Sequence, residues 1–112
     1  MTRLLQSLGS DVERAMTDVN VPSYIIDRTG VVVWLNPAAE SIVGDVRGQR
    51  FTDVVTPGDR PRAKEAFARK IVGKEKVTDA EVDLVGADGR AVSVEVSSVP
   101  LKEGHQIVGV FG

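Results

Sequence analysis

The run of five apolar residues from Val31 to Leu35 constrains this sequence more than any other feature. Gly30 precedes the run and Asn36-Pro37 follows it, so it has the length of one short strand. Side chains of a strand alternate between its two faces. Strict alternation places Val32 and Trp34 on one face, and Val31, Val33 and Leu35 on the other. Because both faces are apolar, we expect helices of the same domain to cover one face. A further helix, from residues 1–20 or from a partner, is expected to cover the other.

Residues 1–20 have the spacing of an amphipathic helix. Apolar residues recur at alternating intervals of three and four, which is the pattern of a coiled-coil seam. A helix of this length is marginal in isolation, so the seam must pack against something. The sequence leaves open whether the seam packs on the sheet of its own domain, on a second copy of the chain, or on both. The residues of the seam, which are our candidates for a homodimer interface, are Leu5, Leu8, Val12, Ala15 and Val19.

The rest of the chain, residues 21–112, changes several times between strand and helix signals. Asn36 is the predicted N-cap of a short helix, and Asp59 that of a long one. Asp88-Gly89 predicts a hairpin turn. The predicted elements are strands at 24–27 and 31–35, helices at 38–43, 51–54 and 59–72, and strands at 79–84, 92–97 and 106–111. This order predicts an α+β fold, with a five-stranded antiparallel sheet and helices on one of its faces.

Four short motifs follow one another in the order and spacing of a known family. The motifs are Asp27-Arg28-Thr29-Gly30 with the apolar run and Asn36-Pro37-Ala38-Ala39-Glu40 behind it, Ile42-Val43-Gly44, Thr56-Pro57-Gly58-Asp59, and Ala87-Asp88-Gly89-Arg90. Together they resemble the PAS domain family over about Val21 to Gly112. The resemblance implies a PAS-like five-stranded antiparallel sheet with helices on one face and an N-terminal flanking helix. We therefore divide the chain into an N-terminal helix at 1–20 and a PAS-like sensor domain at 21–112.

The resemblance also implies a role. PAS domains are sensory or protein-contact modules that control effector domains on the same chain, and many dimerise through a helix before the first strand. We expect a non-catalytic regulatory module that forms a homodimer and controls an effector domain C-terminal to residue 112, in a larger bacterial regulator. The alternative is a ligand-free protein–protein interaction module that docks through its sheet face.

The sequence lacks the residues that several chemistries of this family require. It has no cysteine, which rules out disulfides and the cysteine–flavin adduct of light sensors. The single histidine, His105, lies in a predicted turn, so the long helix has no haem ligand and a hydrolase triad has no rigidly held base. Asp79, Glu81 and Asp83 alternate with apolar residues, which is typical of the polar face of a strand and not of a metal site. We expect no enzyme activity, no metal, no haem and no covalent flavin.

Charge and hydropathy argue against two further classes of partner. The net charge is −2, and the most basic stretch, Arg60 to Lys76, is interrupted by Glu65 and Glu75, so we expect no nucleic-acid binding. The longest apolar run is far too short to span a bilayer, and the N-terminus has no apolar signal core, so we expect no membrane insertion. Without cysteines, a cytoplasmic location is expected.

Many PAS domains hold a small molecule between the sheet and the long helix. The residues expected there in this chain are apolar with few aromatics, which would suit an apolar molecule such as an acyl chain. These side chains could equally meet and fill the core. The sequence leaves both possibilities open. The candidate pocket residues are Trp34, Ile42, Phe51, Val54, Phe67, Ile71, Leu84, Val94 and Val110.

Overall fold

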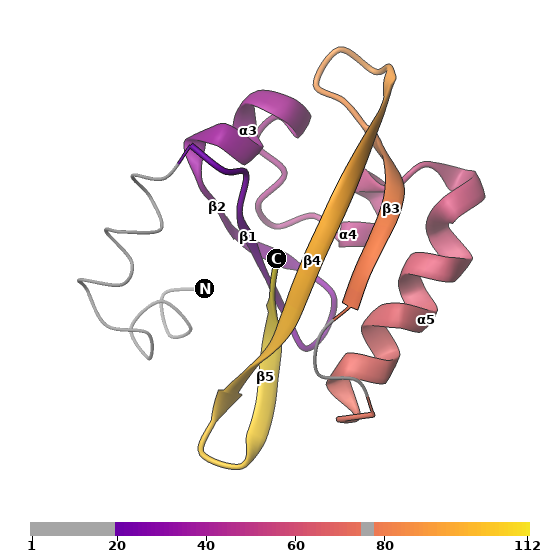
Figure 1. Cartoon of the computed structure of the whole chain (residues 1–112). Helices are drawn as coiled ribbons and strands as arrows, with labels where there is room; N and C mark the ends of the chain where they lie inside the picture. Colours follow the sequence, from indigo (N-terminus) through magenta and orange to yellow (C-terminus); the bar gives the residue numbers. More distant parts are fainter. Residues whose placement is uncertain (1–19, 75–77) are drawn as a thin grey trace.

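The computed structural model describes residues 20–74 and 78–112 (Figure 1). The predicted N-terminal helix and its seam, at residues 1–19, lie outside the described residues. The observed elements are β1 (Tyr24–Asp27), β2 (Val32–Leu35), α3 (Pro37–Val43), α4 (Phe51–Val54), the 3-10 turn η1 (Pro57–Asp59), α5 (Arg60–Ile71), β3 (Thr78–Val85), β4 (Ala91–Glu103) and β5 (Gln106–Phe111). The predicted α+β order of two strands, helices and three strands is confirmed.

The strands form one five-stranded antiparallel sheet in the order β2-β1-β5-β4-β3. The first and last strands of the domain, β1 and β5, are therefore neighbours near the middle of the sheet. The helices follow β2 and precede β3, and they contribute Ala39, Val54 and Phe67 to one apolar cluster with β1 and β2 (Figure 1). We call the face that carries this cluster the inner face and the opposite one the outer face. No helix in the described part of the chain is long and apolar enough to cross a membrane.

Asn36 joins the start of α3 to the start of β1. It is fully buried, and its Oδ1 accepts hydrogen bonds from the backbone N–H of Ala39 at 3.0 Å and of Ser23 at 2.9 Å. Its Nδ2 donates to the carbonyl oxygen of Val21 at 2.7 Å. Gly44 ends the helix in a left-handed conformation, with φ of 82°. The predicted N-cap and the predicted stop of this helix are both confirmed.

Asp59 has a different role from the predicted one. Its backbone is already helical, and its side chain makes no capping hydrogen bond to α5. Instead Oδ2 accepts from the backbone N–H of Asp83 at 2.8 Å, and Oδ1 lies 3.3 Å from the guanidinium of Arg62. Thr56 N–H also donates to the Asp83 carbonyl at 2.9 Å. Asp59 does occupy the predicted N-cap position of α5, but its side chain does not cap the helix. Because η1 continues directly into α5, the carboxylate instead attaches the helix start to the edge strand β3.

A β-bulge interrupts the alternation predicted for the apolar run. Ile25 is paired with Trp34, but the next residue, Ile26, is paired with Val32, so Val33 is the extra residue of β2. As a result Val33 and Trp34 both join the outer cluster with Ile25, whereas Val32 belongs to the inner one. The prediction from strict alternation, which placed Val33 and Trp34 on opposite faces, is wrong. A single inserted residue changes the face of the sheet on which the neighbouring side chains lie. The partly buried residues packed against the outer cluster also come from strands or their flanks: Val31, Leu101, Val108 and Phe111.

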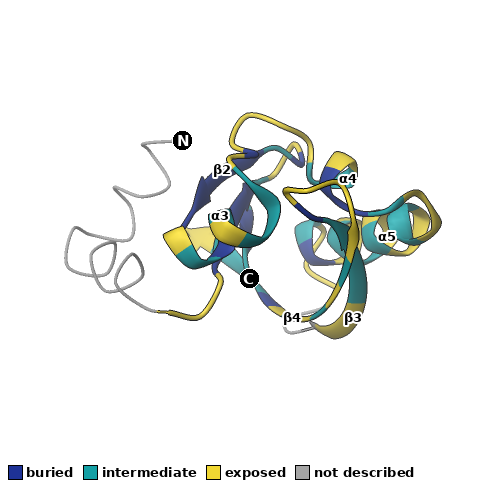
Figure 2. Ribbon diagram, turned by 90° about the horizontal axis from the view of Figure 1, so that it is seen from above, coloured by how far each residue is buried: buried dark blue, intermediate teal, exposed yellow. Residues whose placement is uncertain are grey.

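Burial differs along the sheet. All four residues of β2 are buried, whereas β4 alternates between exposed and intermediate residues over most of its length (Figure 2). The alternating valines of β4, Val92, Val94 and Val96, are not fully buried either. The inner face is therefore well covered at β1 and β2 and incompletely covered at the β3–β4 hairpin.

Candidate ligand-binding site

A cavity of about 810 Å³ lies between the inner face of the sheet and the helices. Pockets that hold small molecules typically have volumes of about 300–1,000 Å³. The sequence is compatible with either a filled core or a cavity between the sheet and the helices. In the structure the side chains leave a cavity there. Every strand and each of α3, α4 and α5 contributes to its wall.

Most of the predicted pocket residues line this cavity. Seven of them come together in its wall: Ile42, Phe51, Val54, Phe67, Leu84, Val94 and Val110. Trp34 and Ile71 do not belong to the wall. The bulge in β2 places Trp34 in the outer cluster, where it is 7% exposed. Ile71 lies outside the wall because its neighbour Lys70 occupies the cavity-facing position in the last turn of α5. Whether these seven side chains contact a ligand stays a prediction.

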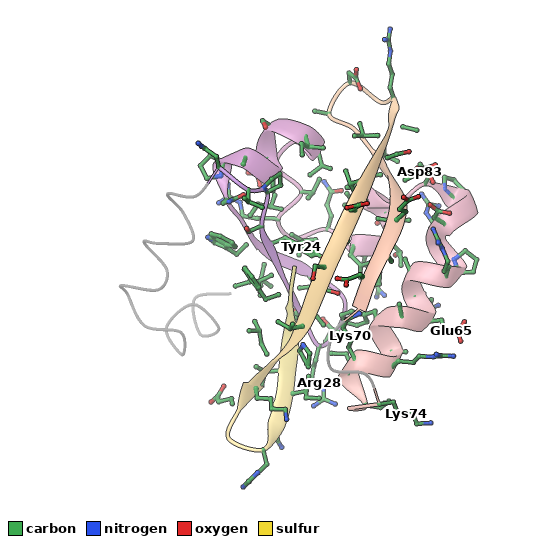
Figure 3. The ribbon with its side chains drawn as sticks, viewed as in Figure 1. Tyr24, Arg28, Glu65, Lys70, Lys74 and Asp83 are labelled. Atoms are coloured by element: carbon green, nitrogen blue, oxygen red, sulfur yellow. The ribbon has the colours of Figure 1, made fainter. Side chains whose placement is uncertain are left out.

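The cavity-facing side of α5 is an apolar stripe that ends in a lysine. Ala63, Ala66, Phe67 and Lys70 all line the cavity, and their spacings of 3, 4 and 7 define one helix face. Two alanines in this stripe leave space below them, and the Phe67 ring packs against Phe51 at a centroid separation of 4.8 Å. Lys70 is only 3% exposed. In Figure 3 it lies between α5 and the sheet.

Three of the buried polar residues of the described chain line the cavity, namely Ser23, Lys70 and Ser98. Tyr24 also lines it and is hydrogen-bonded to the side chain of Ser98. Burial raises the pKa of Tyr24 to about 12, and the hydrogen bond to Ser98 opposes this shift only in part. Tyr24 is therefore a neutral phenol at physiological pH, and it presents a hydroxyl group that both donates and accepts.

Sequence reasoning missed Lys70 and Ser98, although both have a periodic signal. Lys70 follows Phe67 by three residues and Ala66 by four, which is the helical spacing of the predicted stripe. Ser98 continues the alternation of Val94 and Val96 on the inner side of β4. The position of each residue in its periodic pattern indicates burial, whereas a charged or hydroxyl side chain is typical of the surface.

The charged residues at the other lining positions are exposed. Arg62 has a side chain that is 62% exposed, and it donates to the carbonyl oxygen of Glu81 at 2.7 Å. Glu81 and Glu95 line the cavity from β3 and β4, are exposed and are paired across the two strands. His105 is exposed in the β4–β5 turn, as predicted, and does not line the cavity. Among the residues that line the cavity, Lys70 is thus the only buried one with a formal charge.

Solved structures share this architecture. A PAS domain from Colwellia psychrerythraea superimposes with a TM-score of 0.79 at 21% identity, over 90% of this chain and 89% of that one. A domain of a sensory box sensor histidine kinase/response regulator from Geobacter sulfurreducens gives a TM-score of 0.74 at 22% identity, over 95% and 93% of the two chains. The PAS domain of an HTR-like protein from Haloarcula marismortui gives 0.69 at 17% identity, over 98% and 93%. At these identities the likeness concerns the fold.

Comparison of the sequence gives the family. No protein of curated function matches the chain. The model of the PAS fold matches residues 10–112, which include all the described strands and helices. The resemblance predicted from the four motifs is thereby confirmed. With this match and the sheet order β2-β1-β5-β4-β3, the chain belongs to the PAS fold family.

Proposed function

We propose that this chain is a ligand-binding sensory module whose cavity accepts a small molecule with an apolar body. PAS domains are generally sensory and signalling modules, which is the starting point. The observation that carries the proposal is the cavity of about 810 Å³, walled mainly by apolar side chains of the sheet and of three helices. No catalytic role is part of the proposal, because the polar groups around the cavity include no nucleophile paired with a base.

The burial of the wall supports an occupant. Leu84, Val94 and Phe67 point into the cavity, and all three are half-buried, whereas a filled core would bury them fully. A ligand with an apolar body would remove this surface from water. Each methylene that it buries contributes about 0.8 kcal/mol. An acyl chain or a similar aliphatic body is therefore favoured over a small polar metabolite.

The contacts at the start of β1 and just after β5 support a link from the cavity to the segments that flank the domain. Tyr24 lines the cavity at the start of β1, and its backbone N–H and C=O pair with Gly112 at 2.9 and 3.0 Å. A Cβ atom at Gly112 would collide with the Tyr24 ring, so the two residues are in close contact. Val21 and Pro22, which lead into β1, also line the cavity. We infer that a ligand would act on the segments at both ends of the domain, and through them on an effector domain.

Dimerisation is a second part of the proposal. The seam Leu5, Leu8, Val12, Ala15 and Val19 has coiled-coil spacing. Light scattering at micromolar concentration should give a dimer for the wild type and a monomer for Leu8→Glu. Two monomeric proteins would contradict this part.

Mass spectrometry of a denaturing extract tests the ligand. The purified 112-residue chain should release a small molecule in about one copy per subunit. Repeated absence of such a molecule would favour the alternative, a ligand-free module that binds a protein through its outer face. That alternative rests on the protein-contact role of other PAS domains, because the members of the outer cluster are themselves buried.

A further inference from the structure

The position of Lys70 bears on the kind of ligand. Lys70 lies in the last turn of α5, on the same face as Ala63, Ala66 and Phe67, and it is almost completely buried in the wall of the cavity. In Figure 3 its side chain occupies the space between the helix and the sheet. A lysine on a surface helix normally extends its ammonium group into water. Here the sequence places the ammonium beside an apolar cavity.

A buried ammonium group must have anionic or polar partners, because its transfer from water is otherwise costly. Lys70 has an interaction partner within the protein. An ammonium group has three donors, so it can bind a ligand oxygen in addition. The last turn of a helix presents carbonyl oxygens, and a positive charge is favourable there.

We propose that the ligand is a monocarboxylic acid with an apolar body, and that the Lys70 ammonium group binds its carboxylate. This inference rests on the proposed function, because it names the head group of the molecule in the same cavity. The other buried or partly buried polar groups that we consider in the wall are neutral hydroxyls, which would supplement one negative charge and not a second. They are contributed by Ser23, Tyr24 and Ser98.

A monoanion fits the charges of the wall better than a phosphate does. Phosphate groups carry up to two charges and are typically held by several cations or by the planar fork of an arginine. The arginine in this wall, Arg62, is exposed and already bound to Asp59 and to the Glu81 carbonyl. The exposed carboxylates of Glu81 and Glu95 would repel a second anionic group at their end of the cavity. A single carboxylate bound to Lys70 needs no second cation, and it places no second anionic group near Glu81 and Glu95.

Paired titrations with decanoic acid and 1-decanol test the inference. At pH 8 the two molecules share one aliphatic body and differ in the charge of the head group. Isothermal titration calorimetry should show that the 112-residue wild-type chain binds both, with a preference for the acid. In Lys70→Met, which keeps the length and apolar body of the side chain, the acid-to-alcohol affinity ratio should fall by about 10- to 100-fold, as expected for the loss of one charged hydrogen bond.

Two variants act as controls. Lys64→Met makes the same replacement on the exposed side of α5 and should leave the ratio unchanged. Lys70→Arg keeps the charge and should retain most of the preference. Should Lys70→Met fail to give the helical circular dichroism of the wild type, Lys70→Gln provides the same test with a polar, uncharged head.

The outcomes separate the inference from the function on which it rests. An unchanged ratio in a folded Lys70→Met variant that binds both molecules would overturn the role of Lys70 and leave the ligand-binding function standing. A fall of the ratio in Arg62→Met but not in Lys70→Met would place the carboxylate at Arg62 and also overturn the inference. If the wild type bound neither molecule, both the proposed aliphatic ligand and its head group would be contradicted.

Discussion

The two faces of the sheet differ in how completely their apolar side chains are buried, although β1 and β2 supply apolar residues to both faces. On the outer face Ile25, Val33 and Trp34 form a cluster whose members are 0–7% exposed. On the inner face Phe67, Leu84 and Val94 remain half-buried around a cavity of about 810 Å³. The outer face therefore depends on close packing for stability, whereas part of the inner face is open to an occupant. Stability and binding should respond differently to changes on the two faces.

The largest effect on stability is expected from the outer face. Trp34→Ala removes a large buried side chain and should lower the free energy of unfolding by about 3–5 kcal/mol. Because Trp34 does not line the cavity, the affinity of the folded variant for an aliphatic probe such as decanoic acid should change little. Urea denaturation and calorimetric titration measure the two quantities. A loss of binding in a variant that is still folded would show that the two faces are not independent.

A smaller effect is expected where the long helix meets the edge of the sheet. Asp59→Ala removes the acceptor of the Asp83 backbone N–H and should cost about 1.5–3 kcal/mol, as for a hydrogen bond to a charged group. Glu65→Ala is a suitable control, since it breaks an exposed ion pair with Arg69 on the same helix and should cost no more than about 0.5 kcal/mol. Equal losses in urea denaturation would argue that Asp59 acts only as a surface charge.

The ionisation of Tyr24, on the inner face, should make the free energy of unfolding depend on pH. Its pKa is raised to about 12 in the folded chain, above the ordinary value of 10.0, so folding favours the neutral phenol. The stability that this contributes is fully present below pH 10 and is lost as the pH rises through 12. Tyr24→Phe removes this dependence, and at pH 8 it should cost about 1 kcal/mol through the lost hydrogen bond to Ser98.

Denaturation of both proteins between pH 8 and pH 12 measures the effect. The difference in free energy of unfolding between the wild type and Tyr24→Phe should shrink as the pH rises above 10. A difference that stays constant over this range would mean that burial does not favour the neutral form of Tyr24.

The smallest effect on stability is expected from filling the cavity. Ala66→Trp places a ring in open space beneath α5 and should change the free energy of unfolding by less than about 1 kcal/mol, because the space exists already. The same ring should weaken the binding of decanoic acid by at least about tenfold, because it occupies the volume that the aliphatic body requires. Ala68→Trp, on the exposed side of the same helix, should leave binding unchanged.

Local chemistry made most of the fold predictable from the sequence. Asn36 followed by Pro37 began α3 and Gly44 ended it, because capping depends on neighbours a few residues away. The alternation around Asp88-Gly89 gave the β3–β4 hairpin for the same reason. Each of these features is encoded within about ten residues.

The features that shape the site depend on partners far away in the sequence. The bulge at Val33 arises from the pairing of β2 with β1, and it moved Trp34 from the predicted pocket to the outer face. Asp59 occupies the predicted N-cap position, but its acceptor role toward Asp83 depends on a strand that lies 24 residues further along the chain. The spacing of Lys70 fits the stripe of α5, so its position on the helix predicts burial even though its residue type is typical of the surface.

Native mass spectrometry of the purified wild type, Ala66→Trp and Ala68→Trp tests the central claim most directly, because it reports bound mass and subunit number together. We predict that the wild type and Ala68→Trp retain a small molecule in about one copy per subunit, and that Ala66→Trp, equally well folded, does not. A wild type without bound mass that also fails to take up added decanoic acid would contradict the claim that this cavity is a ligand site. Equal occupancy in all three proteins would contradict its location beneath α5.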